Sequence, residues 1–158
     1  MKDVIQLNPI GIIQSVKGEH LIKVDEEYRS GLTNIKGFSH LQIVWWGNLF
    51  DQIEHRKQLI NKMPYKNSPE DLGVFATRSQ FRPNPILITT IYVQRIDLKK
   101  GVIYTPYIDA ENGTPLLDIK PYHKYENVKN CEVPSWCNHW PKSYEDSAEF
   151  NWKAEFNF

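Results

Sequence analysis

The sequence contains few cysteines and no long hydrophobic run. Its only two cysteines among 158 residues, Cys131 and Cys137, are too few for a disulfide framework. No apolar run approaches the roughly 18 residues of a membrane-spanning helix, and Met1–Val4 do not begin a signal peptide. We therefore expect a cytoplasmic protein with no segment inside a membrane.

The sequence also lacks an excess of charge of either sign. Its 19 Lys and Arg residues balance 19 Asp and Glu residues, which argues against a strongly basic nucleic-acid binder but leaves room for a local basic patch. Basic residues gather at 55–57, Lys62, Lys66 and 99–100, where they either contact phosphates or form a solvated face. No Gly-x-Gly-x-x-Gly motif is present, so a Rossmann-type cofactor site is not predicted.

Many short apolar segments and few long helical patterns predict a single all-β domain over residues 1–158. We expect a mainly antiparallel small β-barrel core over 8–128, with short peripheral helices and a C-terminal extension, 129–158, packed on that core. The predicted strands are 10–16, 19–24, 40–46, 74–77, 86–97, 101–110 and 116–119. The predicted helices are 25–32 and 143–150, with 49–63 either a short helix or a loop.

The C-terminal extension is rich in aromatic residues. They are too many for a free tail, so we expect them to pack on the barrel or across a dimer interface. Some of them could instead form a platform for a planar acceptor. The residues are Trp136, Trp140, Tyr144, Phe150, Trp152, Phe156 and Phe158.

Two other features of the sequence are candidate sites, a Cys/Cys/His group and a single histidine. Cys131, Cys137 and His139 follow a spacing, C-x5-C-x-H, that fits no standard zinc pattern, so no metal is predicted. His40, at the start of an apolar strand, is interpreted as a core histidine rather than a catalyst.

A polar corner at residues 73–86 is the most informative segment. Pro83 and Pro85 fix their own φ and push Arg82 and Asn84 towards extended geometry. Since arginine binds carboxylates and phosphates bidentately, the corner suits an anionic or zwitterionic ligand. The alternative is a structural corner whose arginines pair with carboxylates of the chain itself.

This corner and three further segments resemble the TrmO/TsaA-like family, in the family's order and over most of residues 8 to 128. The segments are Ile10–Ser15, Gly37–Leu41, Gly73–Ile86 and Asn112–Tyr122. The resemblance implies binding of S-adenosylmethionine (SAM) on a small antiparallel β-barrel, as a homodimer. The implied activity is N6-methylation of threonylcarbamoyl-adenosine in the tRNA anticodon loop.

The chain departs from the family pattern beside the implied site. Gln80 replaces a frequent proline, Leu87 a glycine and Asn112 an aspartate, and 16–23 is shorter than the loop of many members. These departures leave the acceptor open. A small-molecule acceptor and a non-catalytic SAM-binding module therefore remain alternatives to tRNA methylation.

The resemblance also assigns the site, residue by residue. Arg78 would clamp the carboxylate of SAM, and Gly113 would let the backbone approach the cofactor closely. The alternative for the turn at Gly113 is an ordinary Asn-Gly corner between strands. The implied cofactor residues are Asn48, Leu49, Arg78, Ile88, Asn112, Gly113, Thr114, Pro115 and Leu116.

Arg82, Asn84 and Asp118 are the candidate catalytic residues, at a polar wall where the methyl acceptor docks. Asp118 and Lys120 share one face of a strand, and Asp118 is the candidate proton acceptor. The alternative is a structural cluster in which Asp118 pairs with Lys120 or Arg82. Because methyl transfer is an in-line displacement, alignment can supply much of the rate without a base.

Overall fold

The structure is a computed structural model that describes residues 4–68 and 70–157. Nine strands are present in this part of the chain: β1 (Gly11–Val16), β2 (Glu19–Val24), β3 (His40–Trp46), β4 (Ile60–Asn61), β5 (Leu72–Gly73), β6 (Ile86–Tyr92), β7 (Arg95–Asp97), β8 (Val102–Thr105) and β9 (Thr114–Pro121). The α-helices are α1 (Ile53–Lys57), α2 (Tyr144–Glu149) and α3 (Trp152–Glu155). Short 3₁₀ helices cover Glu26–Leu32, Asn48–Phe50, Val74–Ala76, Lys124–Glu126 and Ser135–Cys137.

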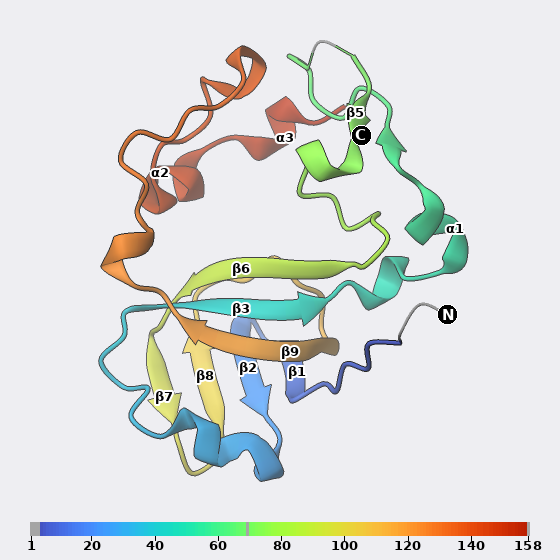
Figure 1. The fold of residues 1–158 in the computed structure, drawn as a ribbon. Helices are drawn as coiled ribbons and strands as arrows, with labels where there is room; N and C mark the ends of the chain where they lie inside the picture. The colour runs from blue at the N-terminus through green and yellow to red at the C-terminus, as the bar shows by residue number, and fades with distance from the viewer. Residues whose placement is uncertain (1–3, 69, 158) are drawn as a thin grey trace.

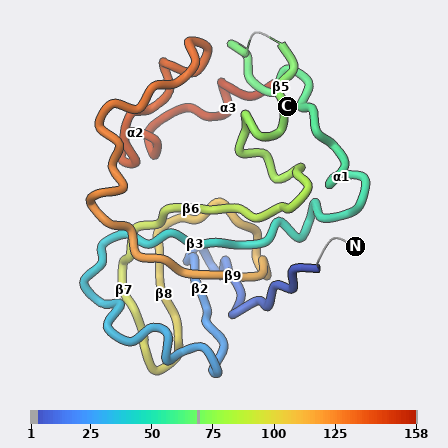
Figure 2. Tube along the Cα trace, viewed as in Figure 1, coloured from blue at the N-terminus to red at the C-terminus, as the bar shows by residue number. Residues whose placement is uncertain are grey.

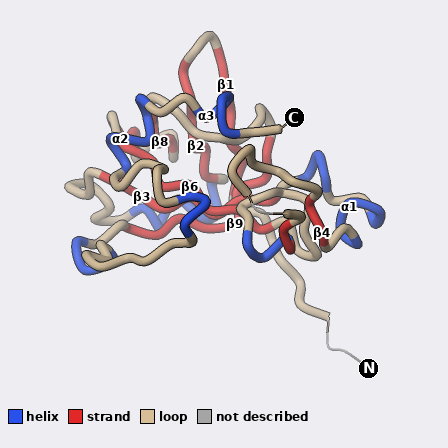
Figure 3. The backbone as a smooth tube through the Cα atoms, turned by 90° about the horizontal axis from the view of Figure 1, so that it is seen from above, coloured by secondary structure: helices blue, strands red, loops and turns tan. Residues whose placement is uncertain are grey.

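Seven strands form one antiparallel sheet in the order β6-β3-β9-β1-β2-β8-β7, and β4 and β5 form a separate pair (Figure 1). The short helices lie around the strands, as the view from above shows (Figure 3). The predicted mainly antiparallel β fold with short helices is confirmed.

The sheet curls around its core (Figure 2), but the described strands do not close into a barrel, so the predicted small β-barrel is not confirmed. Its two edges, β6 and β7, follow each other in the chain and are separated by Val93 and Gln94. The Val93 N–H donates to Ser39 O beside β3, at 2.8 Å, while the Gln94 N–H donates to Tyr104 O in β8, at 2.9 Å. Val93 and Gln94 thus carry the chain from one edge of the sheet, β6, to the other edge, β7. The two edge strands are connected by the backbone but are not paired by hydrogen bonds of the sheet.

The buried face of the sheet forms the core. Leu41, Ile43 and Trp45 alternate with half-buried residues along β3, as the period-2 pattern predicts. Burying each such side chain contributes about 1.5–3 kcal/mol. At Gly11 a Cβ would overlap the carbonyl oxygen of Lys23, so the close approach of β1 and β2 requires glycine there. The strand residues of the core are Ile13, Ile22, Val24, Leu41, Ile43, Trp45, Ile91, Ile103 and Leu116.

Three strand predictions were wrong, one wholly and two in part, since the segment 86–97 is also divided at Val93 and Gln94 into β6 and β7. Residues 74–77 do not form a strand, because the Thr77 N–H and hydroxyl both donate to Val74 O and close a 3₁₀ turn. The strand predicted over 101–110 ends at Thr105, since Pro106 has no N–H and the Thr105 hydroxyl donates to Tyr107 O. The residues beyond Thr105 therefore form a loop.

A β-bulge in β9 decides which of its side chains face outward. The register with β3 shifts between Val44, opposite Asp118, and Trp45, opposite Leu116. Leu116 and Ile119 can therefore both contact the core, which strict alternation would forbid. Asp118 and Lys120 then lie on the outer face of the sheet.

The C-terminal extension lies beside the segment that follows β3, on one side of the sheet (Figure 1). Tyr65 pairs with Phe156, and the Lys66 N–H donates to Glu155 O at 2.9 Å. The ring of Tyr65 stacks on Trp136, at 5.4 Å between centroids, and meets Trp140 edge-on at 4.9 Å. Most aromatic residues of the extension thus pack on one another and on Tyr65, while the Tyr144 ring meets His40 of β3.

Some predicted residues lie at the ends of the chain, outside the part that the structure describes. Phe158 and residues 1–3 lie outside the described residues. No helix in the described part is both long and apolar enough to cross a bilayer.

Candidate functional site

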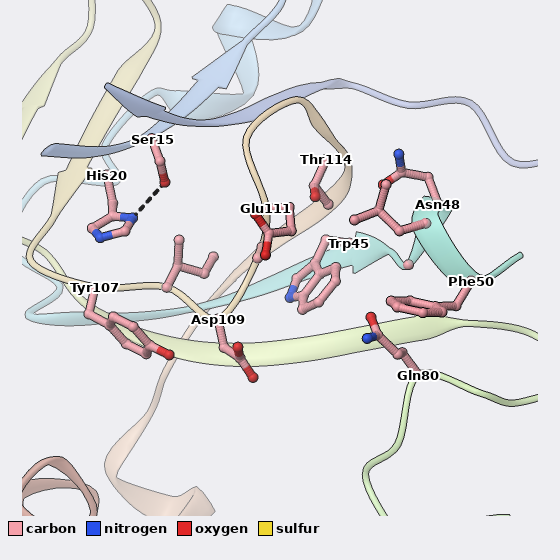
Figure 4. Close-up of a pocket in the computed structure, with 14 residues that line it drawn as sticks. Ser15, His20, Trp45, Asn48, Phe50, Gln80, Tyr107, Asp109, Glu111 and Thr114 are labelled. Carbon is pink, nitrogen blue, oxygen red and sulfur yellow. Dashed lines mark hydrogen bonds between the residues drawn. The ribbon is translucent and has the colours of Figure 1, made fainter. Parts of the chain in front are cut away.

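A cavity of about 460 Å³ opens where the ends of several strands meet (Figure 4). Pockets for small ligands commonly have volumes of about 300–1,000 Å³. Its wall comes from β1 and β2, from Trp45 and residues 47–50 at the end of β3, and from residues 107–111 and Thr114 before and at the start of β9. Gln80 of the polar corner completes it. We call it the cofactor cavity, because three of the residues predicted to bind the cofactor, Asn48, Leu49 and Thr114, line it.

One wall of the cofactor cavity is polar and acidic. Asp109 and Glu111, both exposed, come from the loop that leads to β9. Burial, and then the neighbouring Asp109 carboxylate, raise the pKa of Tyr107 above its usual 10.0. The Tyr107 phenol therefore keeps its proton at neutral pH and can donate a hydrogen bond.

A serine and a histidine meet at another wall. Ser15 Oγ and His20 Nδ1 lie 2.9 Å apart, joined by the dashed line in Figure 4. The His20 ring also contacts the Tyr107 ring edge-on, at 5.8 Å between centroids. The hairpin from β1 to β2 thus adds a hydrogen-bonding pair to the cavity.

Aromatic rings form the apolar part of the wall. Trp45 is buried, and its Nε1–H donates to Thr89 Oγ1 at 3.1 Å, which fixes the indole. Phe50 meets the ring of Phe81 edge-on at 4.8 Å, so the 3₁₀ turn after β3 is held against the polar corner. The rings of Trp45 and Phe50 therefore line the cavity and can contact a planar ligand group.

Three of the predicted cofactor residues come together at this cavity. Asn48, Leu49 and Thr114 all line it, the first two from the turn after β3 and the third from the start of β9. Thr114 follows Leu49 by more than 60 positions in the sequence, and the pairing of β9 with β1 and β3 brings it to the turn after β3. This convergence follows from the sheet order.

The rest of the predicted 112–116 turn positions Thr114. The Asn112 Oδ1 accepts a hydrogen bond from the Ser15 N–H at 3.0 Å, and the Gly113 N–H, with φ at +85°, donates to Ile13 O at 2.8 Å. Pro115 pairs with Ile12 in the ladder. The residue after it, Leu116, is fully buried in the core.

Arg78 and Ile88, the other predicted cofactor residues, lie together but outside the lining of the cofactor cavity. Arg78 Nη2 donates to the Ile88 carbonyl oxygen at 2.7 Å. Arg78 thus occupies a backbone acceptor within β6, which is an edge strand of the sheet. The carboxylate clamp expected of Arg78 stays a prediction.

The candidate catalytic residues have other partners in this structure. Arg82 donates to the carbonyl oxygens of Ser79 and Thr77, both at 2.7 Å, and of Val74 at 3.3 Å. Asn84 accepts a hydrogen bond from Arg56 at 3.2 Å. Arg82 therefore holds the polar corner through backbone carbonyl oxygens, and not through the carboxylates that the structural alternative expected.

Asp118 pairs with Lys120 at 2.6 Å, which is the first of the two pairings expected for it. A second hydrogen bond, from the Ile119 N–H to Asp118 Oδ1, measures 2.8 Å. The hydrogen bond from Lys120 to Asp118 raises the pKa of Lys120. Among the described residues, no hydrogen bond or ion pair joins Asp118 to Arg82 or Asn84.

The structure also shows the surroundings of His40, of the two cysteines and of His139. His40 is half-buried on the outer face of β3 and is not a core residue, because the alternation of β3 turns its side chain outward. Cys131 and Cys137 are both free thiols, and His139 pairs with Glu155 at 2.9 Å. Within residues 4–68 and 70–157, no group of His, Cys, Asp and Glu could hold a metal.

The comparisons with known proteins agree with one another. A family model described as the tRNA-methyltransferase O N-terminal domain matches residues 8–127. The chain is 35% identical over 119 residues to a probable S-adenosyl-L-methionine-binding protein of Pyrococcus horikoshii, covering 75% of this chain and 82% of that protein. It is also 35% identical over 104 residues to a human tRNA (adenine(37)-N6)-methyltransferase, covering 65% of this chain and 22% of the human protein.

A solved structure shares the fold. The crystal structure of TrmO from Pseudomonas aeruginosa matches with a TM-score of 0.64 at 21% identity, over 84% of this chain and 61% of that one. The chain thus spans most of the archaeal protein but less than two thirds of the bacterial and human ones.

Proposed function

Because the chain belongs to the family of the tRNA-methyltransferase O N-terminal domain, we propose that it is a SAM-dependent methyltransferase. Its cofactor occupies the cofactor cavity. The observation that carries this proposal is the convergence of Asn48, Leu49 and Thr114 on one cavity of about 460 Å³. The sequence resemblance independently assigns these three positions to the cofactor.

The chemistry of the cavity wall fits SAM. The cofactor carries a sulfonium, an ammonium and a carboxylate, so its net charge is positive, and the carboxylates of Asp109 and Glu111 complement it. A carboxylate also accepts hydrogen bonds from ribose hydroxyls. The rings of Phe50 and Trp45 offer apolar surface to the adenine.

Bound SAM supplies a methyl group on sulfur that is transferred by in-line displacement. The residues of the chain bind and orient the two reactants. Tyr107 donates a hydrogen bond, while the Asn112 bond to the Ser15 N–H keeps the loop 107–114 in place. Arg82 acts as a positioning residue, because it fixes the corner that carries Gln80 into the cavity wall.

The proposed acceptor is N6 of threonylcarbamoyl-adenosine in the anticodon loop of tRNA. The names of the human and rat relatives, tRNA (adenine(37)-N6)-methyltransferase, support an adenine in tRNA. Neither Asp118 nor Asn84 lines the cofactor cavity, so both are proposed to contact the tRNA beside the reacting base while that base enters the cavity. Asp118 is available because its ion pair with Lys120 is half-exposed. A tRNA acceptor would also place the protein in the cytoplasm.

We further propose that the protein acts as a homodimer, as the resemblance implies. Phe75 is 81% exposed and Ile88 is 47% exposed, which leaves apolar surface on the side of the sheet that carries the polar corner. Light scattering should then give twice the chain mass of 18.6 kDa. A mass of one chain at micromolar concentration would contradict the dimer.

The test of the function uses labelled SAM and tRNA that lacks its own methylation. Label transfer to tRNA supports the proposal. Binding of SAM without transfer would favour a small-molecule acceptor or a non-catalytic SAM-binding module.

A pair of variants tests the cavity itself. Replacing both Asp109→Asn and Glu111→Gln removes two charged acceptors, each contributing about 1.5–3 kcal/mol when paired with a ligand donor. We expect SAM affinity to fall at least about tenfold. The matched control replaces two exposed carboxylates of the 26–32 helix, Glu26→Gln and Glu27→Gln, and should leave the affinity unchanged.

A further inference from the structure

A second cavity, of about 560 Å³, lies between the sheet and the C-terminal extension. The sheet contributes His40 at the start of β3 and Thr90 in β6. The segment after β9 contributes Tyr122 and Lys124, and the extension contributes residues 142–145. The family match ends at residue 127, so one wall of this second cavity lies beyond the matched domain.

The second cavity is basic. Lys124 and Lys142 are both exposed at its wall, and neither forms an ion pair within residues 4–68 and 70–157. His40 adds a ring nitrogen, while Glu145 is the one acidic residue of the lining. Two unpaired ammonium groups in one concave site favour an anionic ligand.

Exposed aromatic rings accompany the lysines. The His40 ring meets Tyr144 edge-on at 5.1 Å and Tyr92 at 5.5 Å. Tyr144 is 43% exposed and Tyr92 is 45% exposed, so both keep ring surface open to solvent. Cationic groups next to exposed rings are the combination that binds single-stranded nucleic acid, through phosphates and stacked bases.

The second cavity lies on the same face of the sheet as the proposed acceptor wall. His40 and Val44 share the outer face of β3, four residues apart, which is about 13 Å along a strand. Val44 lies directly opposite Asp118 in β9, and residues opposite each other share a face. A strand of RNA with its reactive nucleotide near Asp118 can therefore reach the second cavity with flanking nucleotides.

We propose that the second cavity binds the phosphate backbone of the RNA acceptor at Lys124 and Lys142 and stacks one unpaired base on Tyr144. This inference rests on the proposed function, since it takes the acceptor to be RNA. It gives the extension a role, which is to complete an RNA-binding site that the matched domain lacks by itself.

The experiment measures binding of a fluorescently labelled, unmodified tRNA transcript to the full chain at several salt concentrations. The test variant carries Lys124→Gln and Lys142→Gln. Loss of two phosphate contacts should weaken binding. In a plot of the logarithm of the binding constant against the logarithm of the salt concentration, the slope should become less negative by about 1.4, since each single-stranded contact contributes about 0.7. SAM affinity should not change, because neither lysine lines the cofactor cavity.

A matched control removes the same charge elsewhere. Lys23→Gln and Lys36→Gln change two exposed lysines that lie outside the basic groups of the sequence and form no ion pair within the described residues, and should leave the slope unchanged. A third variant, Tyr144→Leu, keeps bulk against His40 but removes the aromatic face, so it should weaken binding at an unchanged slope.

Several results would overturn the inference. An unchanged slope in the Lys124 and Lys142 variant would do so, as would an equal loss in the control. Wild-type protein that binds no tRNA would overturn both this inference and the RNA acceptor. Lysine-dependent tRNA binding without methyl transfer would instead leave this inference standing and contradict only the proposed function.

Discussion

Replacing Arg82 tests whether this residue is structural or catalytic. Arg82→Gln removes a guanidinium that donates to three backbone carbonyl oxygens, at 2.7, 2.7 and 3.3 Å. Hydrogen bonds to charged groups contribute about 1.5–3 kcal/mol each. Since the site is only partly buried and the third bond is long, we expect a loss of about 3 kcal/mol in the free energy of unfolding.

The assay is urea denaturation of the variant and the wild type, with thermal unfolding beside it. For a chain of this size, about 3 kcal/mol corresponds to a fall of roughly 6–12 °C in the melting temperature. The control is Arg95→Gln, which removes an exposed ion pair with Glu19 at 3.9 Å and a cation–π contact with the Tyr104 ring. Each should contribute less than about 1 kcal/mol, so the control should lose less than about 2 kcal/mol. A variant with wild-type stability but no methyl transfer would refute the structural role and restore Arg82 as a catalytic residue.

Four further predictions concern Asn112, Gly11, Asp118 and Glu155. Asn112→Ala breaks the bond to the Ser15 N–H, so SAM affinity should fall in calorimetry and stability should drop by about 1 kcal/mol; Asn112→Asp, which keeps the acceptor, should retain both. Gly11→Ala places a Cβ against the Lys23 carbonyl, and denaturation should show a loss of about 3 kcal/mol or more, whereas wild-type stability would disprove the close approach. Asp118→Asn should slow methyl transfer to tRNA at unchanged SAM affinity; an unchanged rate would remove Asp118 from the acceptor wall. The hydrogen bonds from Trp140 and His139 lower the pKa of Glu155, so its contribution is present above the unfolded pKa and is lost as pH falls through the lower folded value. Tryptophan fluorescence should therefore report loosening of the extension in acid, and Glu155→Gln should remove that part of the pH dependence.

The sheet strands could be predicted where one face is buried. The alternation along β3 and the apolar residues of β1 and β2 are local patterns, and the observed strands match them within one residue. The break at Val93 and Gln94 and the bulge in β9 could not be predicted, because both depend on which strands become neighbours. The helix at 74–76 follows from a side-chain bond of Thr77 that no pattern of apolar residues encodes.

The candidate site was predictable only where a motif marks it. Asn48, Leu49 and Thr114 were found through the resemblance, and the fold brings them together. His20 and Asp109 were missed, because one lies in a plain hairpin and the other in a segment interpreted as a strand. Pro106 was the available signal, since a proline there ends β8 and begins a loop.

The most direct test of the central claim is a crystal structure of the chain with bound SAM. The account predicts the cofactor between Trp45, Phe50 and Thr114, with its ribose or ammonium group at Asp109 or Glu111. A cofactor bound elsewhere, with none of Trp45, Phe50 and Thr114 in contact with it, would contradict the assignment of the site.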